Sequence, residues 1–301
     1  MMTARPVWLT QQERGSRRLM RTIAVVALGL GRPVGRLLLY PICAYFILFS
    51  SRARRASREY LRRALARRPT WSDVFRHHHV FAATILDRVF LLSGRFDAFK
   101  FEISGLDALL AAIAHGRGCL LMGAHFGSFE VLRMLAQTRA PVRVRVLMHE
   151  QNAVKLNSVL GALNPEMMRD VITLGRPQTM LEVRDAIEAG ETVGLLADRV
   201  VAGDRLVACD FLDGVAQFPQ GPFLLAALLR AEVILFSAAY LGDGRYRVCF
   251  TPFPTVSTVE RDPAALAAQC QAYARWLEAN CRSDPYNWFN FYDFWAPASG
   301  A

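Results

Sequence analysis

The hydrophobic pattern changes at about residue 99, where short apolar runs begin to alternate with longer segments of mixed polarity. Short apolar runs are typical of buried strands, and apolar positions three or four residues apart are typical of helices. The pattern predicts strands at 99–103, 119–122, 142–148, 171–174, 192–197, 233–239 and 246–251. It predicts helices at 106–114, 128–137, 154–163, 178–189, 222–229 and 263–281. This alternation predicts an α/β fold with a mostly parallel or mixed sheet flanked by helices, and with an antiparallel edge.

The N-terminal part of the chain has a helical pattern instead. Residues 8–21 have the pattern of a short amphipathic helix, and residues 71–93 that of a longer helix with one apolar side. Between them, two apolar runs at 23–30 and 37–49 are separated by a short linker at 31–36. The second run is shorter than the roughly 20 residues that cross a bilayer easily. Together the two runs predict either a tilted, broken span or a re-entrant hairpin.

The basic character of the chain is confined to its N-terminal part. Residues 1–68 hold 15 arginines and two acids, a net charge of +13, whereas the rest of the chain carries 21 basic and 24 acidic residues, a net of −3. The slightly acidic remainder argues against a nucleic-acid groove. Eight arginines fall within residues 51–68, next to the apolar runs, where such a cluster favours anionic inner-leaflet lipids. An ordinary solvated helix face is the alternative.

These patterns divide the chain into a membrane-associated N-terminal region with a basic helix, 1–69, and an α/β domain, 70–301. The six cysteines form no CxxC pair and lie mostly among apolar residues, so we expect buried free thiols in a reducing, cytoplasmic setting. The adjacent His77, His78 and His79 point in different directions on a helix, and no metal site is predicted.

Candidate chemistry lies where two predicted central strands end. His125 follows the strand at 119–122, and Asp198 follows the strand at 192–197. Ligands of open α/β sheets bind beyond the carboxyl ends of such strands. Between His125 and the next helix, Gly127 permits a tight turn or the close approach of a substrate, and Ser128 is a good N-cap.

Glu130, on the helix that Ser128 begins, is expected to accept the second imidazole N–H of His125 and so to orient this residue as a general base. No G-x-S-x-G nucleophile motif occurs. The pattern therefore favours a base that deprotonates a substrate hydroxyl, which then attacks an acyl carbonyl. A structural histidine held by its neighbour is the alternative.

The chain resembles a known family through an ordered set of motifs. His125-x-x-x-x-Glu130 after an apolar strand is similar to the HxxxxE/D motif of the lipid A late (secondary) acyltransferases, which have the glycerolipid acyltransferase fold. The apolar strand that ends at Asp198-Arg199, the glycine-bearing segment 211–222 and the segment 284–288 resemble further motifs of that family. The N-terminal apolar segment and the basic residues after it match the family's layout. The resemblance covers nearly the whole chain.

This resemblance implies transfer of an acyl chain from an acyl carrier protein thioester to a hydroxyl of a (glyco)lipid at the cytoplasmic face of the inner membrane. His125 would be the base and Glu130 its partner. Arg199 or Arg176 would bind phosphate or polarise the thioester, with Arg133 a weaker candidate. Asp198 would orient Arg199 or the acceptor, and we place Gly127 and Ser128 in the same substrate-binding set. No cofactor is needed, because the thioester already carries the activation.

Two departures from the family pattern bear on the acceptor. The segment 197–199 lacks the usual proline and a second acidic residue, and aromatic residues with one acid, Asp293, follow Trp288 where the family usually has basic residues. The ending resembles the relatives associated with aryl-polyene pathways, which are expected to acylate a different lipid or to transfer a polyene chain. A hydrophobic tail packed on the core, or lying in the membrane interface, is the alternative explanation of this ending.

Two other functions stay open. A thioesterase-type hydrolase of the same fold would use His125 and Glu130 to cleave thioesters with water. A non-catalytic lipid-binding scaffold of a membrane synthase would bind lipid equally well without His125. The intact His125–Glu130 pair argues against the scaffold, and the apolar N-terminal segment argues against a simple hydrolase, which would not need a membrane.

Overall fold

The computed structural model of the 301-residue chain describes residues 25, 27–139, 143–149, 169–176, 178–200, 204–254 and 262–296. The described strands are β1 (Lys100–Ser104), β2 (Cys119–Gly123), β3 (Val144–His149), β4 (Val171–Leu174), β5 (Thr192–Leu196), β6 (Leu206–Asp210), β7 (Val215–Pro219), β8 (Glu232–Gly242) and β9 (Arg245–Phe253). The described helices are α3 (Arg32–Phe49), α4 (Ser51–Ala64), α5 (Trp71–Leu92), α6 (Leu106–Ala114), α7 (Phe129–Arg139), α9 (Thr179–Glu188), α10 (Gly221–Leu229) and α11 (Pro263–Ser283), with a short 3₁₀ turn at Phe96–Ala98. The helices predicted at 8–21 and 154–163 lie outside the described residues.

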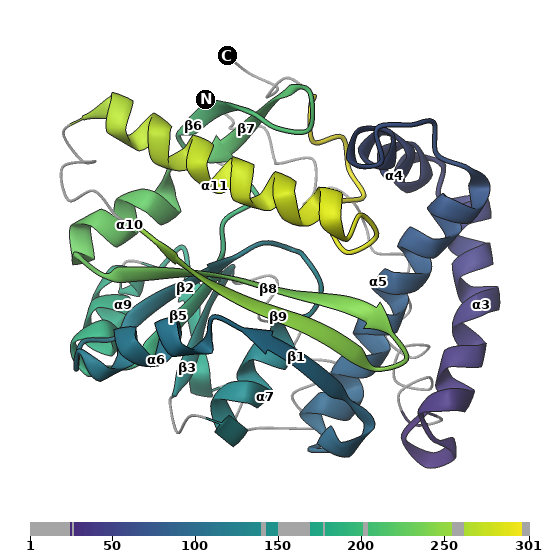
Figure 1. The fold of residues 1–301 in the computed structure, drawn as a ribbon, viewed down its shortest axis with the longest axis horizontal. Helices are drawn as coiled ribbons and strands as arrows, with labels where there is room; N and C mark the ends of the chain where they lie inside the picture. Colours follow the sequence, from purple (N-terminus) through teal and green to yellow (C-terminus); the bar gives the residue numbers. More distant parts are fainter. Residues whose placement is uncertain are drawn as a thin grey trace.

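Seven strands form one sheet in the order β1-β9-β8-β2-β5-β3-β4. Every neighbouring pair in it is parallel except β8 and β9, which are antiparallel and joined by a tight turn at 242–244. The predicted mixed, mostly parallel sheet flanked by helices is therefore confirmed (Figure 1). Because β2 lies between β8 and β5, the chain segments that follow β2 and β5 emerge side by side at one edge of the sheet.

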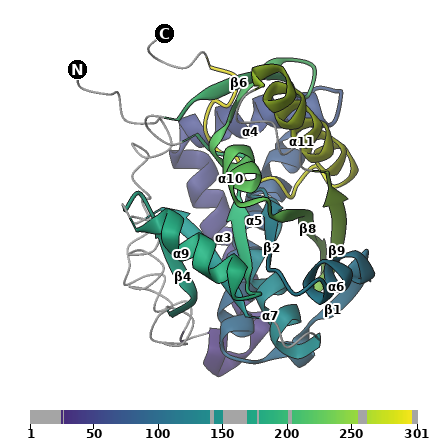
Figure 2. The ribbon, with the colours of Figure 1, turned by 90° about the vertical axis from the view of Figure 1, so that its left-hand side faces the viewer.

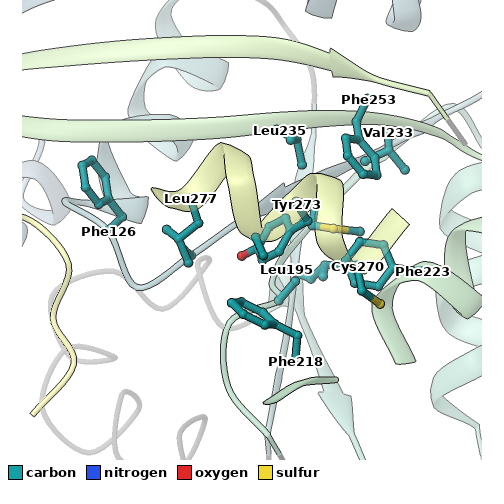
Figure 3. Packing of buried hydrophobic residues seen from close by; sticks show 14 of the residues in the cluster. Phe126, Leu195, Phe218, Phe223, Val233, Leu235, Phe253, Cys270, Tyr273 and Leu277 are labelled. Carbon is teal, nitrogen blue, oxygen red and sulfur yellow. The ribbon is translucent and has the colours of Figure 1, made fainter. Parts of the chain in front are cut away.

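Hydrophobic cores lie on both faces of the sheet. Successive side chains of β2 point to opposite faces, and all of them are buried. Leu120 and Met122 belong to one core, which α9, α10 and α11 cover, whereas Cys119 and Leu121 belong to the other, beneath α5, α6 and α7. Figure 3 shows part of the first core, with Tyr273 of α11 among aromatic and aliphatic side chains. The Tyr273 hydroxyl donates to the Gly123 carbonyl at 2.7 Å and so fixes the end of β2.

The N-terminal helices pack on this body. Of the residues 31–36, which were expected to separate the two apolar runs, Gly31 does so as the N-cap of α3 with a φ of +91°, whereas residues 32–36 already belong to α3. Pro33 stands in the first turn, where a proline costs no hydrogen bond. Within the described residues, α3 is the one helix long and apolar enough to cross a membrane. Tyr60 and Leu61 of the basic helix α4 are fully buried in the first core. The division into regions 1–69 and 70–301 stays a prediction.

A two-stranded antiparallel sheet of β6 and β7 was not predicted. These strands flank the turn at 212–214, where Leu212 and Asp213 have positive φ. The resemblance placed this turn within a glycine-bearing segment, although an Asp-Gly pair between short apolar runs is itself a hairpin signal. The sheet lies beside α11, next to the C-terminal segment that contributes to the site (Figure 2).

Candidate active site

The loop between β2 and α7 holds His125 through backbone contacts to two distant segments. Gly127 N–H donates to the Asn287 carbonyl at 2.8 Å, and Ser128 N–H donates to the Ala238 carbonyl of β8 at 3.1 Å. The His125 carbonyl itself accepts from Phe289 N–H at 2.8 Å. Hydrogen bonds on both sides of His125 therefore fix the position of its backbone, as a preorganised catalytic residue requires.

The partner of the His125 imidazole is Asp198, which follows β5. His125 Nδ1 lies 2.8 Å from Asp198 Oδ1, and the His125 backbone N–H donates to Asp198 Oδ2 at 3.1 Å. An ionised carboxylate only accepts, so Nδ1 carries the proton and Nε2 keeps its lone pair. The Asp198 side chain is 2% exposed and that of His125 is 26% exposed. This is the geometry of a general base whose free nitrogen faces outward and whose tautomer is set from behind.

The charges around the pair set its protonation. Burial lowers the pKa of His125, and the positive charges of Arg199 and Arg88 lower it further, against the opposing effect of Asp198. Burial alone would raise the pKa of Asp198, but the contacts with His125, Arg199 and Trp288 outweigh it and lower this pKa to about 2. At neutral pH the site therefore holds a neutral imidazole and a carboxylate, the combination that a general base needs.

Trp288 completes the support of Asp198, a role that sequence reasoning missed. Its indole Nε1–H donates to Asp198 Oδ2 at 2.9 Å, and its side chain is fully buried between Tyr60 and Phe211. The Trp288 carbonyl lies 2.8 Å from Nε2 of His77, which is therefore a donor. A buried indole N–H generally needs a hydrogen-bond acceptor, so the sequence could have indicated that Trp288 has one. It does not show that this acceptor is Asp198.

Glu130 does not contact His125, contrary to the sequence-based expectation. No hydrogen bond joins these two described residues, and Asp198 occupies the place that Glu130 was expected to fill. Glu130 lies in the first turn of α7 and faces α5, where its Oε1 is 2.8 Å from Nε of Arg88. The two atoms form an ion pair without an aligned hydrogen bond, and Glu130 Oε2 has no hydrogen-bond partner. Arg88 was not predicted from the sequence, because nothing in the helical pattern of 71–93 distinguishes it.

Ser128 also differs from its expected role. It precedes α7, as an N-cap does, but its hydroxyl is buried without a hydrogen-bond partner. Its backbone N–H, bonded to Ala238, is the group that the fold uses. Ser128 Oγ and Glu130 Oε2 are thus two buried polar atoms close together in sequence that the described protein groups leave unpaired, and such atoms in a functional site are available to a substrate or to water.

The candidate arginines lie in three different places. Arg199 directly follows Asp198, donates to the Phe289 carbonyl at 3.3 Å, and is close enough to lower the pKa of both His125 and Asp198. Arg133 is buried on α7 and lies 3.5 Å from Asp170. Arg176 follows β4, three strands away from β2, which at roughly 4.8 Å per strand is about 14 Å to one side. The structure therefore brings Arg199 close to His125 and leaves Arg176 at the end of the edge strand β4.

Gly127 is required by the fold at this turn, which gives a testable consequence. Its φ is +66°, and a Cβ there would lie 1.7 Å from the Ala238 carbonyl oxygen of β8. Gly127→Ala is therefore expected to lower the free energy of unfolding by about 2–4 kcal/mol, because it adds both strain and a backbone clash. Gly94→Ala is the matched control, since Gly94 has a φ of +72° and nothing within 4 Å. Urea unfolding of the two variants should show the larger loss for Gly127→Ala, and equal losses would contradict this account.

The protonation of His125 predicts a pH dependence. Because its pKa is lowered, kcat/KM is expected to rise with pH on an acid limb whose midpoint lies below the ordinary imidazole value of 6.5, and to be level above it. The positive charge of Arg199 lowers this pKa, so Arg199→Gln should move the midpoint to higher pH. Rate profiles of the two proteins check the prediction. A midpoint that moves down, or no acid limb, would show that another group limits the rate.

The adjacent histidines His77, His78 and His79 lie on α5. Among the described residues there is no group of three His, Cys, Asp or Glu side chains placed to hold a metal ion. Two of the three histidines have separate hydrogen-bond partners, since His77 lies 2.9 Å from the Ser57 hydroxyl and His78 lies 2.9 Å from the Val74 carbonyl, whereas His79 packs against the rings of Tyr40 and Phe75. Burial lowers the pKa of His77 to about 3, so it is a neutral structural residue. The six cysteines are free thiols, five of them buried.

Comparison with known proteins identifies the family of this chain. A family profile described as bacterial lipid A biosynthesis acyltransferase matches residues 86–296, which is more than two thirds of the chain. No curated protein matches the chain. The matched segment includes His125, Asp198 and Trp288, and begins just before Arg88. The chain therefore belongs to the bacterial lipid A biosynthesis acyltransferase family and is an acyl-transferring enzyme.

Proposed function

We propose that this enzyme moves an acyl chain from an acyl carrier protein thioester to a hydroxyl of a membrane (glyco)lipid, with His125 as the general base. The observation that carries the proposal is the 2.8 Å contact between His125 Nδ1 and the buried Asp198 carboxylate. This contact leaves Nε2 as the basic atom of a side chain that is open on its outer side. The family match supports acyl transfer between a donor and a lipid acceptor.

In this mechanism Nε2 of His125 takes the proton of the acceptor hydroxyl as its oxygen attacks the thioester carbonyl. The tetrahedral intermediate collapses with loss of the donor thiolate, which recovers the proton from the His125 imidazolium. The products are a lipid ester and a free thiol, and no covalent acyl-enzyme is formed. Asp198 stabilises the imidazolium while it exists and keeps Nδ1 protonated, so that Nε2 is basic again after each cycle.

The cations beside the base supply electrostatic stabilisation. Arg199 and Arg88 both act on His125 through their charge, and both are suited to the developing oxyanion or to an anionic group of a substrate. In this proposal Glu130 acts through Arg88, which it holds at 2.8 Å, and is a positioning residue. Glu130→Gln should therefore cost less activity than a change at His125. Ser128 would contribute its unpaired hydroxyl to the substrate site, and Gly127 the tight turn that places this hydroxyl near the base, with Arg176 about 14 Å to one side.

The proposal also includes the acyl donor, the lipid acceptor and the cellular location of the enzyme. An acidic carrier protein would be attracted to the exposed arginines of α4, and these side chains also suit anionic inner-leaflet lipids at the cytoplasmic face of the inner membrane. Residues 1–69 would be the membrane-associated region and residues 70–301 the acyltransferase domain. By its resemblance to the ending of the aryl-polyene relatives, the segment after Trp288 would indicate an acceptor or an acyl chain like theirs, while Phe289 and Phe294 themselves are buried in the cores.

Thiol release tests the reaction type and the donor together. Purified enzyme with acyl–carrier-protein thioester should release thiol only when a lipid hydroxyl acceptor is present, and faster than with acyl-coenzyme A. Release in water alone, at an unchanged rate without acceptor, would identify a hydrolase of this fold. If the protein binds lipid but releases no thiol from any donor, the result would favour the non-catalytic lipid-binding scaffold.

A further inference from the structure

Helix α3 is docked lengthwise on the body of the protein. It runs antiparallel to α5, with Arg32 opposite Asp87, Gly35 opposite Leu86 and Tyr40 beside His79 (Figure 1). The inner side of α3 is a stripe at every fourth position, Gly35, Leu39, Cys43 and Ile47, and all four residues are buried. A Cβ on Gly35 would lie 3.2 Å from Leu86 Cδ2, so the two helices approach closely at this point.

Both ends of α3 are tied to the globular part. At its start, the Arg32 guanidinium binds both oxygens of the fully buried Asp87, at 2.7 and 2.9 Å, and Tyr246 of β9 donates to the same carboxylate at 2.9 Å. Arg36 binds the Tyr240 hydroxyl of β8. A helix that crossed the bilayer here would take the charged helix α5 and this end of the sheet with it, at a large desolvation cost.

The outer side of α3 is apolar and uncovered in the described part of the chain. It presents Val34, Leu37, Leu38, Pro41, Tyr45 and Leu48 at spacings of three and four residues, with Leu37 69% and Leu48 67% exposed. No acidic residue occurs on this helix. A continuous exposed stripe of this kind on a folded enzyme is a docking surface, because isolated domains seldom expose such patches to water.

Basic and aromatic groups gather where α3 ends. Arg54 of α4 binds the Ile47 carbonyl and lies over the Trp71 ring, with Arg58 4.1 Å from the centroid of the same ring. Trp71 is itself 58% exposed. Helix α4 carries six arginines and one acid, and that acid is paired with Arg62 and Arg63. An apolar stripe beside exposed tryptophan and arginines is complementary to an anionic lipid surface.

We propose that α3 lies in the plane of an anionic bilayer surface, with its outer stripe in the headgroup–acyl boundary, and does not span the membrane. The inference rests on the proposed function only in that both place the enzyme at a membrane, and it adds how the enzyme is seated there. Its chemistry is that of an interfacial amphipathic helix, whose apolar face enters the boundary by roughly 5–10 Å.

Vesicle binding tests the surface. The double variant Leu37→Glu/Leu48→Glu should bind vesicles of phosphatidylcholine and phosphatidylglycerol at least about 100-fold more weakly, since two leucines leave the lipid. Leu181→Glu and Leu228→Glu are matched controls on α9 and α10, where the leucines are 51% and 54% exposed. Unchanged binding by the double variant would overturn the proposal. Thiol release with a detergent-dispersed acceptor should persist in this variant, which separates the surface from the chemistry.

Depth measurement tests the orientation. Fluorescent probes on single cysteines at Val34, Leu38, Tyr45 and Leu48, in a Cys249→Ser background, should be quenched by brominated lipids at one common shallow depth. A spanning helix would place the probes at 38 and 45 deeper than those at 34 and 48 by roughly 5 Å, at 1.5 Å per residue, and that profile would overturn the proposal. Probes that no lipid quenches would overturn it as well, because they would show that a second copy or another protein segment covers this face.

Discussion

Asp198→Asn is expected to lower kcat by about 10²–10⁴-fold while the protein stays folded, because the amide sets the wrong tautomer of His125. Asp198 accepts three N–H groups, from His125 Nδ1, from the His125 backbone and from the Trp288 indole. An asparagine offers only one acceptor oxygen. If this oxygen keeps the two donors on the Oδ2 side, the amide NH₂ faces Nδ1, and the imidazole proton moves to Nε2. The nitrogen that should accept the substrate proton is then already protonated.

Steady-state kinetics and unfolding of the same preparations check this prediction. The loss should fall mainly on kcat, since Asp198 is buried behind the imidazole and does not reach the substrate. Asp185→Asn is the matched control, because Asp185 is 63% exposed and paired with Arg184 at the surface. Full activity in a folded Asp198→Asn protein would remove Asp198 from the mechanism and return Glu130 to consideration as the partner of the base.

His125→Ala is expected to lower kcat/KM by about 10³–10⁴-fold, the upper part of the range for a lost general base, and to remove the acid limb of the pH profile. His125→Asn should be equally inactive but more stable, because its amide can still donate to Asp198 Oδ1, whereas alanine leaves that buried oxygen unpaired. The pair of variants separates loss of the base from loss of a structural hydrogen bond.

The matched control for the base is His115→Ala. His115 is exposed at the end of α6 and contacts Glu232 at the surface, so its removal should leave the rate unchanged. Circular dichroism establishes that each variant is folded before its rate is compared. A folded His125→Ala protein that keeps the wild-type rate and acid limb would show that another residue moves the proton.

Local patterns predicted most of the fold. The apolar runs at 119–122 and 192–197 were expected to be central strands, and β2 and β5 are neighbours in the middle of the sheet. The helix predicted at 106–114 has the bounds of α6. The hairpin of β6 and β7 was missed because the hydrophobic pattern does not follow burial there: the apolar residues at the start of β6 are only partly buried, and the exposed first residue of β7 is Val215. The helices predicted at 8–21 and 154–163 lie outside the described residues and stay predictions.

The site was predicted less completely, for a physical reason. Sequence reasoning placed His125 and Asp198 at the ends of central strands, but it assigned the imidazole contact to Glu130, which is only five residues away. The contact actually spans 73 positions and depends on β5 being the strand next to β2, which a single sequence does not give. Trp288 lies 90 positions after Asp198, and Arg88 lies on α5, which precedes β2; both reach the site through packing that no local spacing encodes.

Mass spectrometry of total lipids tests whether this enzyme acylates a lipid and whether His125 is required for the transfer. Cells that carry the wild-type chain are compared with cells that carry folded His125→Ala at the same level. We expect one lipid to gain a single acyl group with the wild-type chain only, and the mass of that lipid would identify both the acceptor and the transferred chain. The same lipid appearing in equal amount with His125→Ala would contradict the account.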